Sequence, residues 1–327
     1  MLQMKELLEI AVAMGRKADF RSAEEIKEKL TRVRKQYESL PEERRIFFDK
    51  EGLTNPYLDS RIHFCGSVRK IKKVLAGIDI DSAELMVARY LSNHNPKSPV
   101  DAVIAHHPLG KALADLGEVM DMQVDILEKY GVPINVAESL MHMRIGEVSR
   151  GISASNHFKA VDTARLLDMN LLNVHTPADN LVARFVEEKV SKDKPRYLSD
   201  VLASLLEIPE YAEAAKRGSG PRLFTGNEHA RVGKIAFSEI TGGTEGSKDI
   251  YQRLAQVGIG TVISMHQSEE HRKQAEAAHI NVVIAGHISS DSLGMNLYLD
   301  ELERRGVEIV PCSGLIRFSR NKKGKKK

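Results

Sequence analysis

Short apolar runs that alternate with amphipathic stretches constrain the fold of this chain most strongly. A strand, a covering helix and a further strand, repeated in this order, build a parallel sheet covered by helices. The expected strands are KVLAGIDI (73–80), VDAVIA (100–105), NLLNV (170–174), VGKIAFSEI (232–240), GTVISM (260–265), NVVIAG (281–286) and VEIVPCSG (307–314). We therefore expect an α/β protein with two similar lobes, whose mixed, mostly parallel sheets are covered by helices.

The helices between these strands follow from apolar spacing and from their end signals. A long helix is expected over residues 111–131, closed by Gly131, and another over 158–169. Residues 1 to about 50 also read as helical, with a capping box at Ser22 and Glu25, and form an N-terminal helical arm. The turn-rich stretch LTNPYLDS (53–60) reads as a linker.

Interruptions of this alternation of strands and helices set the expected domain boundaries. We expect an N-terminal helical extension (1–67), a first α/β lobe (68–190), a connecting segment (191–227), a second α/β lobe (228–318) and a basic disordered tail (319–327).

Composition narrows the class of protein. Of 327 residues, 42% are hydrophobic and 28% charged, as in ordinary soluble globular proteins. No apolar run approaches the roughly 20 residues needed to span a bilayer, and the N-terminus lacks the features of a signal peptide. Only two cysteines occur, with no CxxC spacing, which favours a reducing compartment and a cytoplasmic location.

The net charge of +3 comes from the C-terminal tail. The stretch RNKKGKKK (320–327) holds six positive residues, and subtracting these six charges from +3 leaves −3 on the rest. Such a run is usually a solvated end, and less often a tail that binds nucleic acid. Because the chain has no Trp and only 5% aromatic residues, nucleic-acid binding is disfavoured as the main function.

Histidines and aspartates gather directly after the expected strands, where ligands bind in open α/β sheets. His106 and His107 follow one strand, and His175, His266 and His287 each follow another. The spacing His-x-x-x-Asp occurs twice, and residues i and i+4 share one face of a helix. These pairs are His175 with Asp179 and His287 with Asp291.

A metal site explains this pattern better than isolated hydrogen bonds do. One such pair alone is more often a hydrogen bond at a helix start, but two pairs and a His-His dipeptide together favour metal ligation. Mixed nitrogen and oxygen ligands suit Zn, Mn, Fe or Co. A carboxylate such as Asp179 has two oxygens and is able to bridge two ions, the usual hydrolytic arrangement.

Other polar residues have weaker signals. The loop TGGTEGS (241–247) is either a plain glycine turn or an anion cradle formed by Gly242, Gly243 and Thr244. Glu239 ends a strand in the same layer and is a candidate general base. Asp79 and Asp81 read as capping groups more readily than as partners of metal ligands.

Several motifs resemble, in order and spacing, the metal-bearing motifs of the Nif-three-like dinuclear-metal proteins, many of which are labelled GTP cyclohydrolase 1 type 2 homologues. The three that carry the resemblance are VIAHHPLG, NVHTPADN and VVIAGHISSDSLG. KVLAGIDIDSAELM, KIAFSEITGGTEG and GTVISMHQSEEHRKQA are also similar to segments of that family. The resemblance covers roughly residues 70–318, and residues 1–67 have no evident counterpart.

The resemblance implies a site of two divalent metal ions per subunit. The implied ligands are His106, His107, Asp179, His287 and Asp291, with Asp179 bridging. His175 is implied as a further ligand or proton-transfer group, and His266 and His271 line the cleft between the lobes. Asp291 departs from the family pattern, which usually has Glu there. The family also implies a homo-oligomer, commonly a hexamer.

Two functions from different classes follow. The first is a metal-dependent hydrolase in which two ions lower the pKa of a shared water and His175 or His266 shuttles protons. Its substrate would be a small molecule, a nucleotide by the family label, with GTP opened at C8 and formate released, and TGGTEGS on the phosphates. The second is a non-catalytic metal-binding or metal-trafficking scaffold. A third interpretation is an interaction protein recruited through the helical arm or the basic tail.

Overall fold

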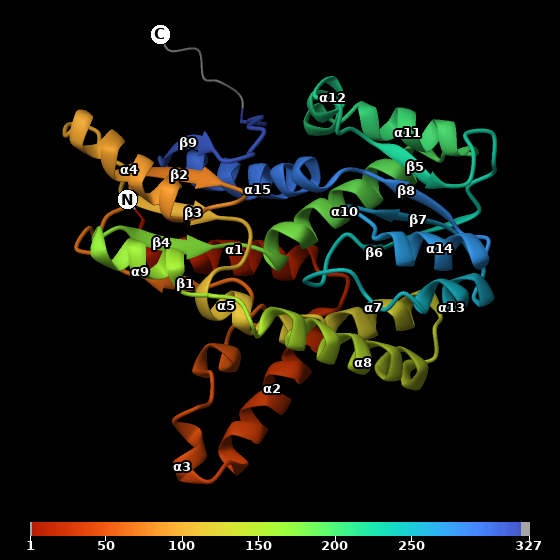
Figure 1. Ribbon diagram of the computed structural model, residues 1–327, viewed down its shortest axis with the longest axis horizontal. Coiled ribbons are helices and arrows are strands. Elements are labelled where there is room, and N and C mark those ends of the chain that lie inside the picture. Colours follow the sequence, from red (N-terminus) through yellow and green to blue (C-terminus); the bar gives the residue numbers. More distant parts are fainter. Residues whose placement is uncertain (1, 322–327) are drawn as a thin grey trace.

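The computed structural model describes residues 2–321, and most of the expected basic tail, residues 322–327, lies outside them. Two sheets lie side by side with helices on their faces, and a helical arm projects from the body (Figure 1). The expected α/β fold of two mixed, mostly parallel, helix-covered sheets with an N-terminal helical arm is confirmed.

The first sheet has five strands, all parallel except β1, which is antiparallel to β4. Its order is β1 (Ile62–Phe64), β4 (Asn170–Asn173), β3 (Ala102–Ala105), β2 (Lys73–Gly77) and β9 (Glu308–Cys312). The second sheet has four strands, with β5 antiparallel to β8. Its order is β5 (Arg222–Thr225), β8 (Asn281–Ile284), β7 (Ile259–Ser264) and β6 (Lys234–Glu239).

Strand β9 lies in a different sheet from the one the sequence order suggests. We expected it to end the second lobe, but it pairs in parallel with β2, from Lys73 opposite Glu308 to Gly77 opposite Cys312. The helix α15 (His287–Arg304) explains the difference, because its 18 residues span about 27 Å and carry the chain from the second sheet back to the first. The domain boundaries themselves stay a prediction.

The helices fill the intervals between the strands. They are α1 (Met4–Ala18), α2 (Ala23–Ser39), α3 (Glu42–Arg45), the 3₁₀ helix η1 (Lys50–Leu53), α4 (Ser82–His94), α5 (Gly110–Ala114), α6 (Leu116–Val119), α7 (Met122–Tyr130), α8 (Ile134–Ile152), α9 (Lys159–Leu166), α10 (Thr176–Asp193), α11 (Leu198–Leu206), α12 (Pro209–Lys216), α13 (Ile250–Gln256), α14 (Glu269–Ala277) and α15. Across residues 2–321, none of these helices is long and apolar enough to cross a membrane.

The single long helix expected over 111–131 is wrong. The segment forms three pieces, α5, α6 and α7, because the turns between them let Leu116, Val119 and Met122 pack on the buried ring of Tyr57. Gly117 also lies so close to α8 that an added Cβ would be 2.6 Å from the Ser149 hydroxyl. Tertiary packing thus overrides the apolar spacing that predicts one helix.

Alternating side chains of the first sheet pack against two helical layers. Val74 and Ala76 of β2 face α1, α10 and α15, while Leu75 faces α4 and α9, as the two-residue period of a strand requires. The second sheet packs on α10, α11, α12 and α15 on one face and on α7, α8, α13 and α14 on the other. Helices α10 and α15 therefore belong to the cores of both sheets and join them.

These two helices approach each other unusually closely. A Cβ on Gly294 of α15 would lie only 2.3 Å from the carbonyl oxygen of Ala178 in α10. Ala178 precedes Asp179, and Gly294 lies one turn from Asp291. The absence of a side chain at Gly294 is what lets α15 approach the first turn of α10 so closely.

The first helix of the arm is part of the core, whereas α2 and α3 project from it (Figure 1). Gly15 of α1 contacts Pro177 so closely that a Cβ would lie 2.6 Å from the proline Cα. The buried Asp19 carboxylate accepts hydrogen bonds from Arg21 (2.9 Å), Tyr57 (2.8 Å) and Asn180 of α10 (3.3 Å). These contacts fix the start of the chain to the helix that carries Asp179.

The last described residues are also attached to the body. The Arg320 guanidinium donates to both carboxylate oxygens of the fully buried Glu210 at 2.7 Å, and the Asn321 amide donates to the Asp300 carbonyl. Residues 319–321 therefore pack on α12 and α15.

Replacing Gly294 with alanine should destabilise the protein by about 1–3 kcal/mol, because the new methyl group overpacks the crossing of α10 and α15. Denaturant unfolding measures this change. The matched control is Gly151→Ala in α8, where nothing lies within 4 Å of the added Cβ, so that stability should hold or rise by roughly 0.5–1 kcal/mol. Equal stability of the two variants would contradict the close crossing.

Candidate metal centre

The five predicted metal ligands lie at the carboxyl ends of strands from both sheets. His106 and His107 directly follow β3, and Asp179 lies in the first turn of α10, after β4. His287 begins α15 after β8, and Asp291 lies one turn later. Gly286, with φ of +109°, makes the left-handed turn that starts α15.

The structure brings all five residues together, with His175 as a sixth. Their ligand atoms form three overlapping groups, each within 4.8 Å: His106, His107 and His175; His107, His287 and Asp291; and His106, Asp179 and Asp291. His106, Asp179 and Asp291 are buried, whereas the side chains of His107 and His287 retain 25% and 41% exposure. The cluster is therefore closed on one side and accessible on the other.

Several buried ligand atoms point at one another without a hydrogen bond. His106 Nε2 lies 3.4 Å from both Asp179 Oδ1 and Asp291 Oδ1, and the Nε2 atoms of His107 and His287 lie 3.4 and 3.5 Å from Asp291 Oδ2. Within residues 2–321, His106 Nε2, Asp179 Oδ1 and both Asp291 oxygens have no hydrogen-bond partner. Burying such atoms unpaired costs several kcal/mol, which a bound cation offsets. The residues thus fit a metal site.

The other ring nitrogen of three histidines is held by the protein. The Nδ1 atoms of His106, His107 and His175 lie 2.9 Å from the Val174 carbonyl, 2.6 Å from Asp79 Oδ1 and 2.8 Å from Asp59 Oδ2. A proton on each Nδ1 donates to these oxygens and leaves Nε2 free to face the cluster, the usual arrangement behind metal ligands. Asp79 is therefore a partner of His107 and not a capping group, whereas Asp81 does cap α4.

Asp59 was not expected at the site. It lies in the stretch that reads as a linker, 116 residues from His175 in the sequence. No local pattern marks it, because its role depends on the arm folding back over the end of β4.

Burial and the close approach of carboxylates and imidazoles shift the pKa values of Asp179, Asp291 and His175. Burial, together with the Asp291 carboxylate, raises the pKa of Asp179 to about 6. Burial opposes the charged form of Asp291, but the imidazoles of His106 and His107 hold the pKa of this carboxyl well below its usual range. Burial alone would lower the pKa of His175, yet the Asp179 and Asp59 carboxylates raise it to about 9. The carboxylates thus stabilise the protonated form of His175, as they would stabilise a bound metal cation.

A second group of polar side chains, which follows strands β6 and β7 of the second sheet, borders the cluster. The His266 ring lies 4.7 Å from the His287 ring between centroids, and His266 Nδ1 lies 3.0 Å from Glu245 Oε1. Burial opposes ionisation of Glu245, but the His266 hydrogen bond and the His271 charge lower its pKa to about 2. Burial likewise opposes the charged form of His266, and Glu245 raises the pKa of this histidine. The sequence did not single out Glu245, which reads only as one residue of a glycine-rich loop.

The remaining predicted site residues lie around this second group. Burial and the Glu245 charge raise the pKa of Glu239 to about 7. Both ring nitrogens of His271 face protein atoms, Nδ1 at 2.7 Å from the Ser268 hydroxyl and Nε2 at 3.0 Å from the Gly246 carbonyl. His271 therefore holds the end of the loop 241–247 in place.

The glycine loop itself packs on α7. The Gln123 amide donates to the carbonyls of Gly242 and Thr244 at 2.7 and 2.8 Å. Gly242 and Gly243 have φ of +96° and +92°, and a Cβ on either would collide with Gln123 or Val119. The glycines thus serve the packing of the loop, and its proposed contact with phosphate stays a prediction.

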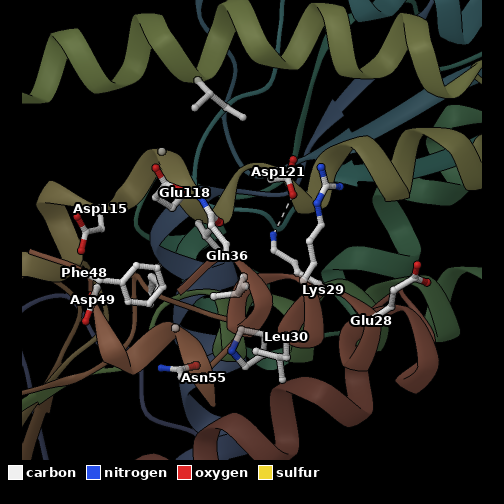
Figure 2. Close-up of a pocket in the computed structure, with 18 of the residues that line it drawn as sticks. Glu28, Lys29, Leu30, Gln36, Phe48, Asp49, Asn55, Asp115, Glu118 and Asp121 are labelled. Carbon is white, nitrogen blue, oxygen red and sulfur yellow. Dashed lines mark hydrogen bonds and ion pairs between the residues drawn. The ribbon is translucent and has the colours of Figure 1, made fainter. Parts of the chain in front are cut away.

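A cavity of about 830 Å³ lies apart from this site, between α2 and the helices α6 and α8 (Figure 2). Its wall is rich in carboxylates, including Glu28, Asp115 and Glu118, and the Lys29 ammonium pairs with Asp121 across it at 3.0 Å. None of the predicted site residues lines it.

The fold and the His/Asp cluster together define a class of α/β protein with a candidate metal centre between two sheets. A crystal structure of a NIF3 superfamily protein from Sphaerobacter thermophilus is 30% identical to this chain, with a TM-score of 0.72. The match covers 96% of this chain and 99% of that one. The chain belongs to the NIF3 superfamily, as the motif resemblance predicts.

Two more distant structures have lower sequence identities and lower TM-scores. A Thermus thermophilus protein is 16% identical with a TM-score of 0.45, and the match covers 90% of this chain and 99% of that one. A Bacillus cereus protein related to NIF3 is 12% identical with a TM-score of 0.39, over 91% and 98% of the two chains. The sequence matches no protein-family model and shows no match among curated proteins. The family assignment rests on the Sphaerobacter structure.

The Sphaerobacter match also corrects one expectation. Residues 1–67 were expected to have no counterpart in the family, but only 4% of this chain lies outside the match, far less than the arm occupies. Most of the arm therefore has a counterpart in that protein, consistent with the packing of α1 in the core.

Replacing Glu245 with glutamine should lower the pKa of His266, because the carboxylate that favours the imidazolium is removed. Histidine NMR titration measures this shift. The raised pKa of His266 contributes stability below its unfolded value of 6.5, and this contribution is lost as the pH rises through the folded value. The variant should therefore lose more stability at pH 6 than at pH 9.

The control is Glu270→Gln on the exposed surface of α14, where the carboxylate is 3.9 Å from Lys248 and does not touch His266. It should leave the His266 titration unchanged. An unaltered titration in the Glu245 variant would show that the two side chains do not interact.

Proposed function

We propose that this protein is a dinuclear-metal-dependent hydrolase that acts on a nucleotide. The observation that carries the proposal is the convergence of unpaired, buried ligand atoms from His106, Asp179 and Asp291 beside the more exposed His107 and His287. Buried atoms of this kind support metal binding. These two partly exposed imidazoles support catalysis, because catalytic metal sites keep an open position whereas structural sites are closed.

The arrangement of the ligands supports two ions. Asp291 Oδ1 faces His106, while Asp291 Oδ2 faces His107 and His287. The two oxygens thus belong to different groups of ligands, which suits a carboxylate shared between neighbouring ions. Asp179 resembles it, since Oδ1 faces His106 and Oδ2 lies 3.8 Å from His175 Nε2. Asp179 and Asp291 are the two residues that would hold the pair together.

The chemistry that two divalent ions supply is a more acidic water and polarisation of the attacked carbon. The chain's own groups complete the site. His266 lies at its accessible edge with 41% of its side chain exposed, and its Nδ1 is held by Glu245. Its Nε2 is then available to give or take a proton. Glu239, with a pKa near neutrality, is a second proton-transfer group.

The family label points to GTP as the substrate. Opening the guanine ring at C8 consumes one water, and a second water releases that carbon as formate. In this proposal the loop 241–247 binds the phosphates and His266 transfers protons at the ring. A homo-oligomer, commonly a hexamer in the family, is part of the same proposal.

Metal analysis with a nucleotide assay tests the proposal. Protein purified without chelator should contain about two divalent ions per chain and release formate from GTP or hydrolyse another nucleotide. The Asp179→Ala variant should lose most of the metal and at least about 100-fold of the activity, because the ion-dependent step is lost. Elemental analysis and formate detection are the measurements.

The matched control is Asp162→Ala, an exposed aspartate of α9 that pairs with Arg165 on the same helix. It should retain metal and activity. Two ions without turnover of any nucleotide would favour the metal-binding scaffold over the enzyme. No metal after reconstitution with Zn, Mn, Fe or Co would refute both.

A further inference from the structure

We infer that the N-terminal arm, taken together with the linker that follows it (residues 1–67), supplies a positioning residue of the metal centre, Asp59, which orients His175 toward the ions. The inference rests on the proposed metal centre and goes beyond it, because Asp59 lies outside every motif that resembles the family. Through Asp59, the N-terminal extension contributes directly to the geometry of the site.

The contacts of Asp59 single it out among the acidic residues of the arm. The side chain is fully buried, and its Oδ2 lies 2.8 Å from His175 Nδ1. The same oxygen accepts a hydrogen bond of 2.6 Å from the Thr176 hydroxyl. Because Thr176 begins α10, the carboxylate holds both the histidine and the helix that carries Asp179.

The backbone around Asp59 fixes it in turn. The amide of Asn173, at the end of β4, donates to the Asp59 carbonyl at 2.6 Å, and the His175 N–H donates to the Ser60 hydroxyl at 2.8 Å. Arg61 directly precedes β1, and β1 pairs with β4. The segment that carries Asp59 is therefore attached to the strand that leads to His175. Asp59 is therefore held at a fixed place behind the ring.

The contact with Asp59 determines which ring nitrogen of His175 faces the cluster. With the Nδ1 proton donated to Asp59, the Nε2 lone pair of His175 faces Asp179 and the rings of His106 and His107. Carboxylates behind metal-binding histidines fix the ring and its tautomer, and their loss typically weakens metal affinity 10- to 100-fold. Without Asp59 the ring of His175 is free to rotate or to present the wrong nitrogen.

The experiment compares Asp59→Ala with Asp59→Asn in the full-length protein. Affinity for Zn²⁺ is measured by competition with a chelator, and the ligand field is read from the visible spectrum of the Co²⁺-loaded protein. Asp59→Ala should bind Zn²⁺ about 10- to 100-fold more weakly and change the Co²⁺ spectrum. Asp59→Asn keeps an oxygen that accepts from Nδ1, so the spectrum should be retained, but loss of the carboxylate charge should still weaken Zn²⁺ affinity measurably, by up to about tenfold.

The matched control is Asp49→Ala, which removes another arm carboxylate, one bound to Arg61 and Lys111. It should lower stability without changing the affinity or the spectrum. If Asp59→Ala does not fold, as judged by circular dichroism, the asparagine variant alone decides, and wild-type affinity in that variant overturns the inference. An unchanged Co²⁺ spectrum in folded Asp59→Ala overturns it as well. A wild-type protein that binds no metal refutes the proposed function instead.

Discussion

The close crossing of α10 and α15 is the contact on which the rest of the structure depends. Gly294 lets the two helices meet at the backbone of Ala178, and the helices pack on both sheets. Each helix follows a strand of a different sheet and carries one buried carboxylate near its start, Asp179 in the first turn of α10 and Asp291 one turn into α15. Their crossing therefore joins the two cores and brings Asp179 Oδ1 and Asp291 Oδ1 each to 3.4 Å from His106 Nε2.

The candidate metal centre buries charged and polar groups together, and a hydrophobic core does not tolerate these groups unless they are paired. Four buried polar atoms of His106, Asp179 and Asp291 lack hydrogen-bond partners among residues 2–321, although neighbouring Nδ1 atoms are each held by an oxygen. The protein thus fixes the outer side of each imidazole and leaves the inner side unpaired. This arrangement is costly for a core and suited to a cation.

The sequence predicted most of this site because its signals are local. Strand ends, the His-His dipeptide and the two His-x-x-x-Asp pairs can all be recognised within a few residues. Asp59 and Glu245 were missed because their roles come from chain segments that meet only in the folded protein. The same limit applies to β9, whose pairing with β2 depends on the path of α15, and to the segment 111–131, where packing on α8 breaks the expected helix.

The sequence suggests that the N-terminal extension is an addition to two lobes. In the structure, hydrogen bonds of Asp19, Tyr57 and Asp59 attach it to the body of the protein. The proposed function requires the cluster between the sheets to hold two metal ions. Anomalous diffraction from a crystal of the manganese-loaded protein, recorded near the metal absorption edge, tests it most directly. Two peaks about 3.5–4 Å apart, bounded by His106, His107, Asp179 and Asp291, are expected. One peak outside this cluster, or none at full manganese loading, would contradict it.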